Sequence, residues 1–221
     1  MELQFTYDAD KEFHNFYNSF KSVNHFAWSK RQKDFFSVFP KLTKESARQF
    51  SQHYIADNKI NVPRVLQTIK NQWSMVGKEF FKRADGIYKT SLPQKSINVY
   101  LTVHDRCSYS FKRSEFFIHF NLEATNKTIM HELWHWYFYF TVGKEIETRS
   151  GIKIYNDIKE ALTVLLNVEF NDLLGGAEDK GYPQHGDLRE FIVGAYEETN
   201  NIYKTINRTL QYLKSNREEI S

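Results

Sequence analysis

The sequence contains a single cysteine, Cys107, among its 221 residues. One thiol cannot form an intrachain disulfide and a cysteine-rich zinc fold needs several, so both classes are excluded. Glycine and proline are also scarce, with nine and four residues, and the first glycine is Gly77. A long glycine-free segment with only Pro40 and Pro63 predicts helices joined by few tight turns.

The sequence also lacks a long apolar run and an excess of one charge. The longest apolar stretch, around residues 133–142, is far shorter than the ~20 residues that a membrane-spanning helix needs. The first residues are partly acidic and show no apolar segment typical of a secretory signal. The net charge of +3 arises from 30 basic and 27 acidic residues, which gives no basis for nucleic-acid binding. We therefore expect a soluble, cytoplasmic protein with neither a membrane nor a nucleic-acid partner.

The sequence is rich in aromatic residues, with 4 Trp, 13 Tyr and 19 Phe, and much of it has helical periodicity. Apolar side chains at helical spacing, such as Phe13, Phe16, Tyr17 and Phe20, predict an N-terminal helical region over residues 1–95. Thr43 is the expected N-cap of one of its helices.

The remaining residues, 96–221, mix strands and helices. Alternating apolar residues predict a strand at 97–103, and a second strand is expected at 116–120, with a weaker signal at 152–155. Helices are expected at 126–142, with Gly143 as the stop, at 157–174, and from 188 to the C-terminus. This order favours an α+β fold in one compact domain, mostly helical with a small sheet.

A His-Glu-x-x-His motif lies in the helix expected at 126–142. His131 and His135 are one turn apart, so both imidazoles can bind one metal ion from the same helix face. Glu132 lies about 100° around the helix, where it can act as a general base toward metal-bound water. The alternative is a structural histidine pair with a surface glutamate, which would place three polar groups on a buried helix for unrelated reasons.

A hydrolytic zinc site needs a third protein ligand. A third histidine on the same segment is excluded, because Phe138 and Thr141 stand where the extended motif has Gly and His. Glu160 is the best downstream carboxylate, since it borders an apolar helical segment and needs a partner there. The alternative is a capping box, in which Glu160 bonds back to Asp157 at the start of a helix.

These residues resemble the zincin metallopeptidases, specifically the gluzincin group, over about residues 97–190. The resemblance implies a zincin-like fold, Zn²⁺ held by His131, His135 and Glu160, and a general base at Glu132. It also implies that the strand at 116–120 is an edge strand to which a peptide substrate adds. Two positions depart from the thermolysin-like pattern: Lys159 stands in place of Asn, and Val164 in place of Asp.

The same resemblance implies a Tyr or His that stabilises the oxyanion of the tetrahedral intermediate. Tyr182 and His185 are the candidates, because they share a loop that follows the helix of Glu160. The alternative is an ordinary surface turn. Asp157 and Asn167 are candidates for orienting a metal ligand.

The expected function is a zinc metallopeptidase that hydrolyses a peptide or protein substrate with metal-activated water. One alternative is a zincin-like binding or regulatory protein that holds a metal ion but shows little or no proteolysis. A second is a helical interaction protein without a metal. The substrate, the role of residues 1–95 and the oligomeric state are not predicted.

Overall fold

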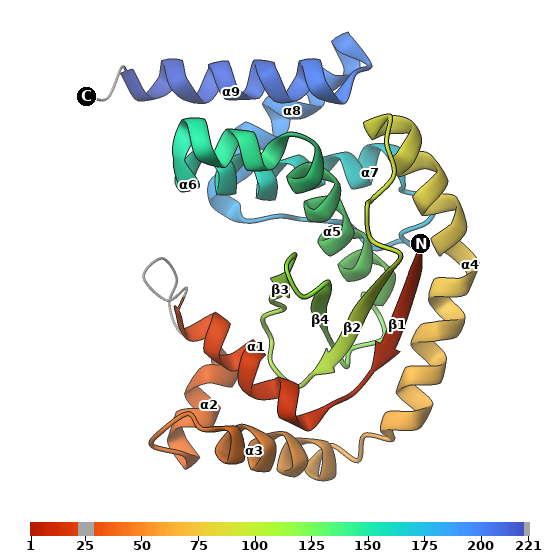
Figure 1. Ribbon diagram of the computed structural model, residues 1–221, viewed down its shortest axis with the longest axis vertical. Coiled ribbons are helices and arrows are strands. Elements are labelled where there is room, and N and C mark those ends of the chain that lie inside the picture. Colours follow the sequence, from red (N-terminus) through yellow and green to blue (C-terminus); the bar gives the residue numbers. More distant parts are fainter. Residues whose placement is uncertain (22–28, 219–221) are drawn as a thin grey trace. The chain divides into compact units, whose positions relative to one another are not determined.

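The computed structural model describes residues 1–21 and 29–218, and the side chains of residues 20–21, among them Phe20, and 216–218 lie outside what it describes. The described residues form an α+β structure that is mostly helical, with a mixed four-stranded sheet (Figure 1). The chain divides into two compact units. The first comprises Met1–Ser74 with Gln94–Thr125, and the second comprises Met75–Pro93 with Asn126–Ser221.

The sheet belongs to the first unit and has the strand order β1-β2-β4-β3. Its strands are β1 (Glu2–Thr6), β2 (Ser96–Thr102), β3 (Tyr109–Ser110) and β4 (Glu115–His119). β2 pairs in parallel with both β1 and β4, whereas β3 pairs antiparallel with β4. The predicted strands at 97–103 and 116–120 are therefore confirmed. β1 was missed, because it pairs with a strand about ninety residues away and leaves no local signal of this partner.

β4 is not the free edge strand that the resemblance implied. β3 pairs with its residues Glu115 and Phe116, and the next amide, of Phe117, donates to the Ser108 carbonyl at 2.9 Å. The backbone groups that an added peptide would need are thus already bonded along this part of β4. β1 is the edge strand on the other side of the sheet.

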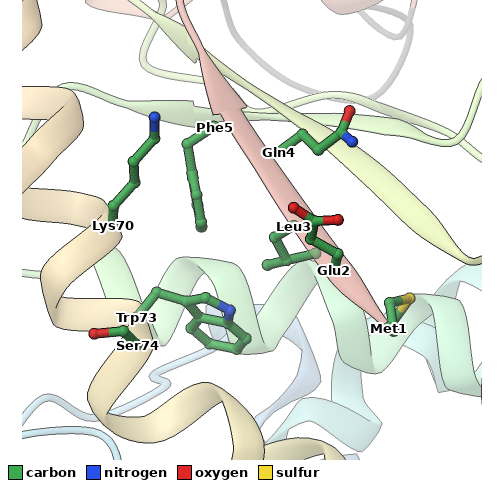
Figure 2. A pocket seen from close by; sticks show the side chains of 8 residues that line it. All are labelled: Met1, Glu2, Leu3, Gln4, Phe5, Lys70, Trp73 and Ser74. Atoms are coloured by element: carbon green, nitrogen blue, oxygen red, sulfur yellow. The ribbon is translucent and has the colours of Figure 1, made fainter.

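A groove of about 560 Å³ runs along β1 (Figure 2). Trp73 extends from α4 (Val62–Tyr88) toward the strand, and Lys70 lies one turn away on the same helix. A lysine beside an exposed strand edge discourages pairing with another chain. None of the residues that line this groove belongs to the predicted metal site.

Three helices of the first unit share an aromatic core. They are α1 (Ala9–Lys21), α2 (Lys30–Val38) and α3 (Lys44–Asp57). Phe16, Phe35 and Phe50 contribute one ring from each helix, with ring centroids 5.1 to 5.8 Å apart. Thr43 accepts from the Ser46 amide as the N-cap of α3, which confirms that prediction.

A buried carboxylate ties α1 to β2 in the same unit. Glu12 accepts from the Thr102 hydroxyl at 2.6 Å and from the Val103 amide at 3.0 Å. Asn15, one turn later, donates to the same Thr102 hydroxyl at 2.8 Å. These bonds replace the water that both side chains lose on folding.

The second unit is built around α5 (Thr125–Phe138), which carries the His-Glu-x-x-His motif. Trp134 packs on Tyr88 and Phe170, with ring centroids 5.0 and 5.6 Å away, and donates its indole N–H to the Leu162 carbonyl at 3.1 Å. Tyr137 stacks on Tyr88 at 5.3 Å. The aromatic side chains of α5 thus fix the rotation of the helix that presents the motif.

The other helical segments of this unit differ from the predicted ones in their boundaries. The predicted helix at 157–174 is divided, and the predicted C-terminal helix breaks at Asn200, whose φ is 43°. The observed segments are η2 (Tyr139–Gly143), α6 (Lys144–Ala161), η3 (Leu162–Val164), α7 (Leu165–Glu169), η4 (Pro183–His185), α8 (Gly186–Thr199) and α9 (Ile202–Glu218). Within the described residues, no helix is both long and apolar enough to cross a membrane.

Gly143 does not stop a helix, contrary to the prediction. Its φ is −62°, and the chain passes through the π-turn η2 directly into α6. A Cβ at this position would lie 3.0 Å from the Phe138 carbonyl oxygen, so the glycine permits a close approach rather than a left-handed cap. The break comes later, at Gly151, whose φ of +83° interrupts α6.

The weak strand predicted at 152–155 is wrong, because this segment is helical. Ile154, Tyr155 and Ile158 are buried together, at the spacing of one helix face. A short run with alternating apolar residues does not distinguish a strand from a helix, and here the longer helical pattern prevails.

Candidate metal centre

α5 presents the three side chains of the motif as predicted. The rings of His131 and His135 lie on one face with their centroids 4.4 Å apart. His135 is buried, whereas the His131 side chain is 22% exposed. Trp134, Trp136 and Tyr137 are fully buried, so the neighbours of the motif anchor the helix.

α6 brings Glu160 to the same place. Its Oε2 atom lies 3.6 Å from His131 Nε2 and 3.5 Å from His135 Nε2. In the described part of the chain, these side chains form the group of His, Cys, Asp or Glu residues suited to a metal ion, with one ligand atom from each within 4.8 Å of the others. The geometry thus assembles the predicted set of two imidazole nitrogens and one carboxylate oxygen.

The capping alternative for Glu160 is wrong. The part of α6 that contains Asp157 and Glu160 resumes directly after the break at Gly151, so Asp157 is inside the helix. An N-cap residue has non-helical backbone angles and stands before the first turn. Glu160 lies in the last turn of α6, which leaves its carboxylate for the two histidines.

Asp179 orients His131. The Asp179 Oδ2 atom lies 2.6 Å from His131 Nδ1, and the Asp179 side chain is buried. Nearby groups, first the hydrogen bond with His131, hold the pKa of Asp179 below its usual range even though burial acts to raise it. The Nδ1–H group therefore donates to a carboxylate, and Nε2 is the ring nitrogen left to bind a metal ion once its own proton is released.

A buried network fixes Asp179 in turn. Arg189, from α8, donates to Asp179 Oδ1 at 3.2 Å and to the Asp179 carbonyl oxygen. The Thr163 hydroxyl also donates to Oδ1, at 2.8 Å. The Asn167 side chain donates to the Asp179 carbonyl oxygen at 2.9 Å and accepts from the Asp179 backbone amide at 2.8 Å. Asn167 was a sequence candidate for orienting a ligand directly, and the structure places it one step further out.

Sequence reasoning missed the role of Asp179. It was one of several acidic residues downstream of the motif, and it lies in a loop whose path depends on α7 and α8. Chemistry alone predicts that such a residue exists, because a metal-binding histidine needs a hydrogen-bond acceptor for its second ring N–H group. That requirement identifies the type of residue but not which of the acids fulfils it.

Glu132 is buried beside the cluster. Burial raises its pKa to about 7, although His131 acts in the opposite direction. Its Oε2 atom has no hydrogen-bond partner among the described residues. A buried carboxylate oxygen without a partner is costly, so this atom fits a site where a water molecule or a metal ion supplies the missing interaction.

The two histidines hold their protons differently. Burial alone would lower the pKa of His131, but the hydrogen bond to Asp179 and the nearby carboxylate of Glu160 raise it to about 10. Burial lowers the pKa of His135 to about 4. Burial alone would raise the pKa of Glu160, yet His135, Lys159 and His131 hold it well below its usual range. A metal ion that binds His131 Nε2 must therefore displace the proton on that nitrogen, which faces Glu160.

The two oxyanion candidates lie before α8. His185 is buried, and its Nε2 atom lies 3.3 Å from Asp157 Oδ1, one helical turn before Glu160. Tyr182 is 43% exposed and packs edge-on against His185, with the ring centroids 6.0 Å apart. Asp157 thus contacts His185, and the oxyanion role of both candidates stays a prediction.

The structure brings together the motif in α5 and Glu160, the residues on which the expected resemblance to gluzincins was based. The donor set of two imidazoles and one carboxylate is that of hydrolytic zinc sites. In comparisons with known proteins, no family model, no curated protein and no solved structure matches this chain.

Proposed function

We propose that this protein is a zinc-dependent, gluzincin-like metallopeptidase with a zincin-like fold in its metal-site region. The observation that carries the proposal is the convergence of His131, His135 and Glu160 within 4.8 Å, with Glu132 adjacent in the sequence. Two histidines and one carboxylate at such a distance leave a fourth tetrahedral position for water.

In this proposal each residue has a distinct task. His131 Nε2, His135 Nε2 and Glu160 Oε2 would hold the ion, which would supply a more acidic water and a polarised carbonyl group. Glu132 would accept the proton of the attacking water and return it to the leaving amine. Asp179 keeps His131 in the required tautomer.

The substrate in this proposal is a peptide or a protein. His185 or Tyr182 supplies the donor to the oxyanion, since both precede α8 and His185 bonds to the helix of Glu160. The environment of Glu132 supports its role, because a general base is most effective when its pKa is close to the working pH.

Metal analysis of protein purified without added metal tests the proposal. The wild type should carry about one zinc ion per chain, and His131→Ala should lose it. His53→Ala is the matched control, because His53 is exposed on α3. Wild type without zinc, or zinc content unchanged in His131→Ala, would contradict the metal site.

A second pair of variants separates the ligand from the base. Glu132→Gln should keep zinc but lose cleavage of a peptide library, whereas Glu160→Ala should lose zinc itself. Zinc bound by the wild type with no cleavage of any peptide would favour the alternative, a metal-holding regulatory protein.

A further inference from the structure

Lys159 is a buried cation next to the metal centre. Its side chain is 8% exposed, and its Nζ atom lies 2.9 Å from Glu160 Oε1. The ring of Tyr155, one turn earlier on α6, is 5.9 Å from Nζ and adds a weak attraction. A buried ammonium is costly unless it is paired, and the Glu160 carboxylate is one of its partners.

The two oxygens of Glu160 therefore have different partners. Oε1 accepts from Lys159, whereas Oε2 faces the Nε2 atoms of His131 and His135 at 3.6 and 3.5 Å. A carboxylate can bind a metal ion through one oxygen or through both. A charge-assisted hydrogen bond to one oxygen competes directly with the second mode.

The other buried cation of this region does not contact Glu160. Arg189 is directed at Asp179, through the side-chain and backbone oxygens of that residue. Lys159 is thus the cation placed to decide how Glu160 binds. Its position next to Glu160 in the sequence, at the end of α6, makes the contact independent of the loops around the site.

We propose that Lys159 is a positioning residue that restricts Glu160 to one-oxygen coordination and so keeps a coordination position open for the substrate water. This inference rests on the proposed zinc site and deepens it. Without Lys159, both oxygens of Glu160 could bind the ion. With the two histidines and the water, the ion would then have five ligand atoms, and it would activate the water less. The loss of a nearby positive charge also strengthens metal binding.

Cobalt substitution tests this positioning role without measuring activity. Four-coordinate Co²⁺ absorbs visible light more strongly than five-coordinate Co²⁺, so the spectrum reports the coordination number. Wild type loaded with Co²⁺ should show the intense four-coordinate spectrum. Lys159→Met, which preserves the volume of the side chain, should show a weaker five-coordinate spectrum and bind Co²⁺ about tenfold more tightly, as expected when one charge-assisted competitor is removed.

Two further variants make the result specific. Lys159→Arg keeps a cationic donor and should restore the four-coordinate spectrum. Lys153→Met removes an exposed lysine from the same helix and should change nothing. Circular dichroism of the metal-free proteins verifies that each variant is folded.

The possible failures are distinguishable. If the wild type takes up no Co²⁺, the metal site and this inference both fall. If Lys159→Met binds Co²⁺ with the wild-type spectrum, or binds it more weakly, the metal site stands and only the role of Lys159 is overturned.

Discussion

The support of His131 can be tested from a distance, through Gly181. This glycine has a φ of +60°, and a Cβ built on it would lie 2.5 Å from Arg189 Nη1 and 2.8 Å from Arg189 Cζ. Gly181→Ala therefore forces the guanidinium away from Asp179. Gly176→Ala is the matched control, because its φ is +84° and a Cβ there would have no atom within 4 Å.

Both variants lose stability through backbone strain, but only Gly181→Ala also loses hydrogen bonds. An alanine in the left-handed region costs about 1–2 kcal/mol, and this applies to both. At Gly181 the displaced guanidinium also loses its bonds to Thr163 and Asp179, which are 3.0 and 3.2 Å long. Hydrogen bonds to charged groups are worth about 1.5–3 kcal/mol each, so Gly181→Ala should be destabilised by at least about 2 kcal/mol more than Gly176→Ala.

Thermal unfolding measures this difference. At roughly 2–4 °C per kcal/mol for a chain of this size, the midpoint of Gly181→Ala should lie at least about 4–8 °C below that of Gly176→Ala. Zinc affinity should also fall in Gly181→Ala alone, because Asp179 loses the cation that fixes it. Equal midpoints and equal zinc affinities in the two variants would refute this account of the network.

Three other predictions concern single groups. Asp179→Asn should lower zinc affinity about 10- to 100-fold, because an amide oxygen holds the His131 Nδ1–H group less strongly than a carboxylate does. Competition with a chromophoric chelator measures this affinity, and an unchanged value would contradict the role of Asp179. Removal of zinc by a chelator should lower the midpoint of thermal unfolding, since an ion present at 1,000 times its Kd stabilises the folded chain by about 4 kcal/mol. An unchanged midpoint would exclude a bound ion. Burial raises the pKa of Glu12 to about 7, so the folded chain binds this proton more tightly than the unfolded chain does. Stability should therefore fall by about 3 kcal/mol as the pH rises from about 4.5 to 7, and this group should change it no further above pH 7. In urea unfolding measured at a series of pH values, Glu12→Gln should remove this fall. A pH dependence unchanged by the substitution would contradict the burial of the charge.

The parts of the site that the sequence predicts depend on local spacing. His131 and His135 are one helical turn apart, so any helix through the motif brings them together. Glu160 was inferred from a chemical need, a third ligand, combined with an apolar helical neighbourhood. These three side chains lie together although α6 begins and ends at other residues than expected.

The parts that the sequence does not predict depend on contacts between distant segments. Asp179 reaches His131 from 48 residues away, through a loop fixed by Arg189 and Asn167. β1 is not predicted for the same reason, because its partner strand β2 is remote in the chain. Gly143 shows a different limit: its residue type is compatible with a stop and with a close approach, and only the backbone angle distinguishes the two.

In the proposed metal site, a bound divalent cation would replace the proton on His131 and change the charge balance around the centre. The carboxylates are balanced by two fixed cations and, in the metal-free protein, by the proton on His131. The carboxylates belong to Glu132, Glu160 and Asp179, and the fixed cations are Lys159 and Arg189. Exchange of one proton for a divalent ion adds one positive charge beside Glu132. That charge favours the ionised form of Glu132, which is the form that accepts a proton from water. In the proposed enzyme, metal binding and ionisation of the general base would thus be coupled through the field of the same ion.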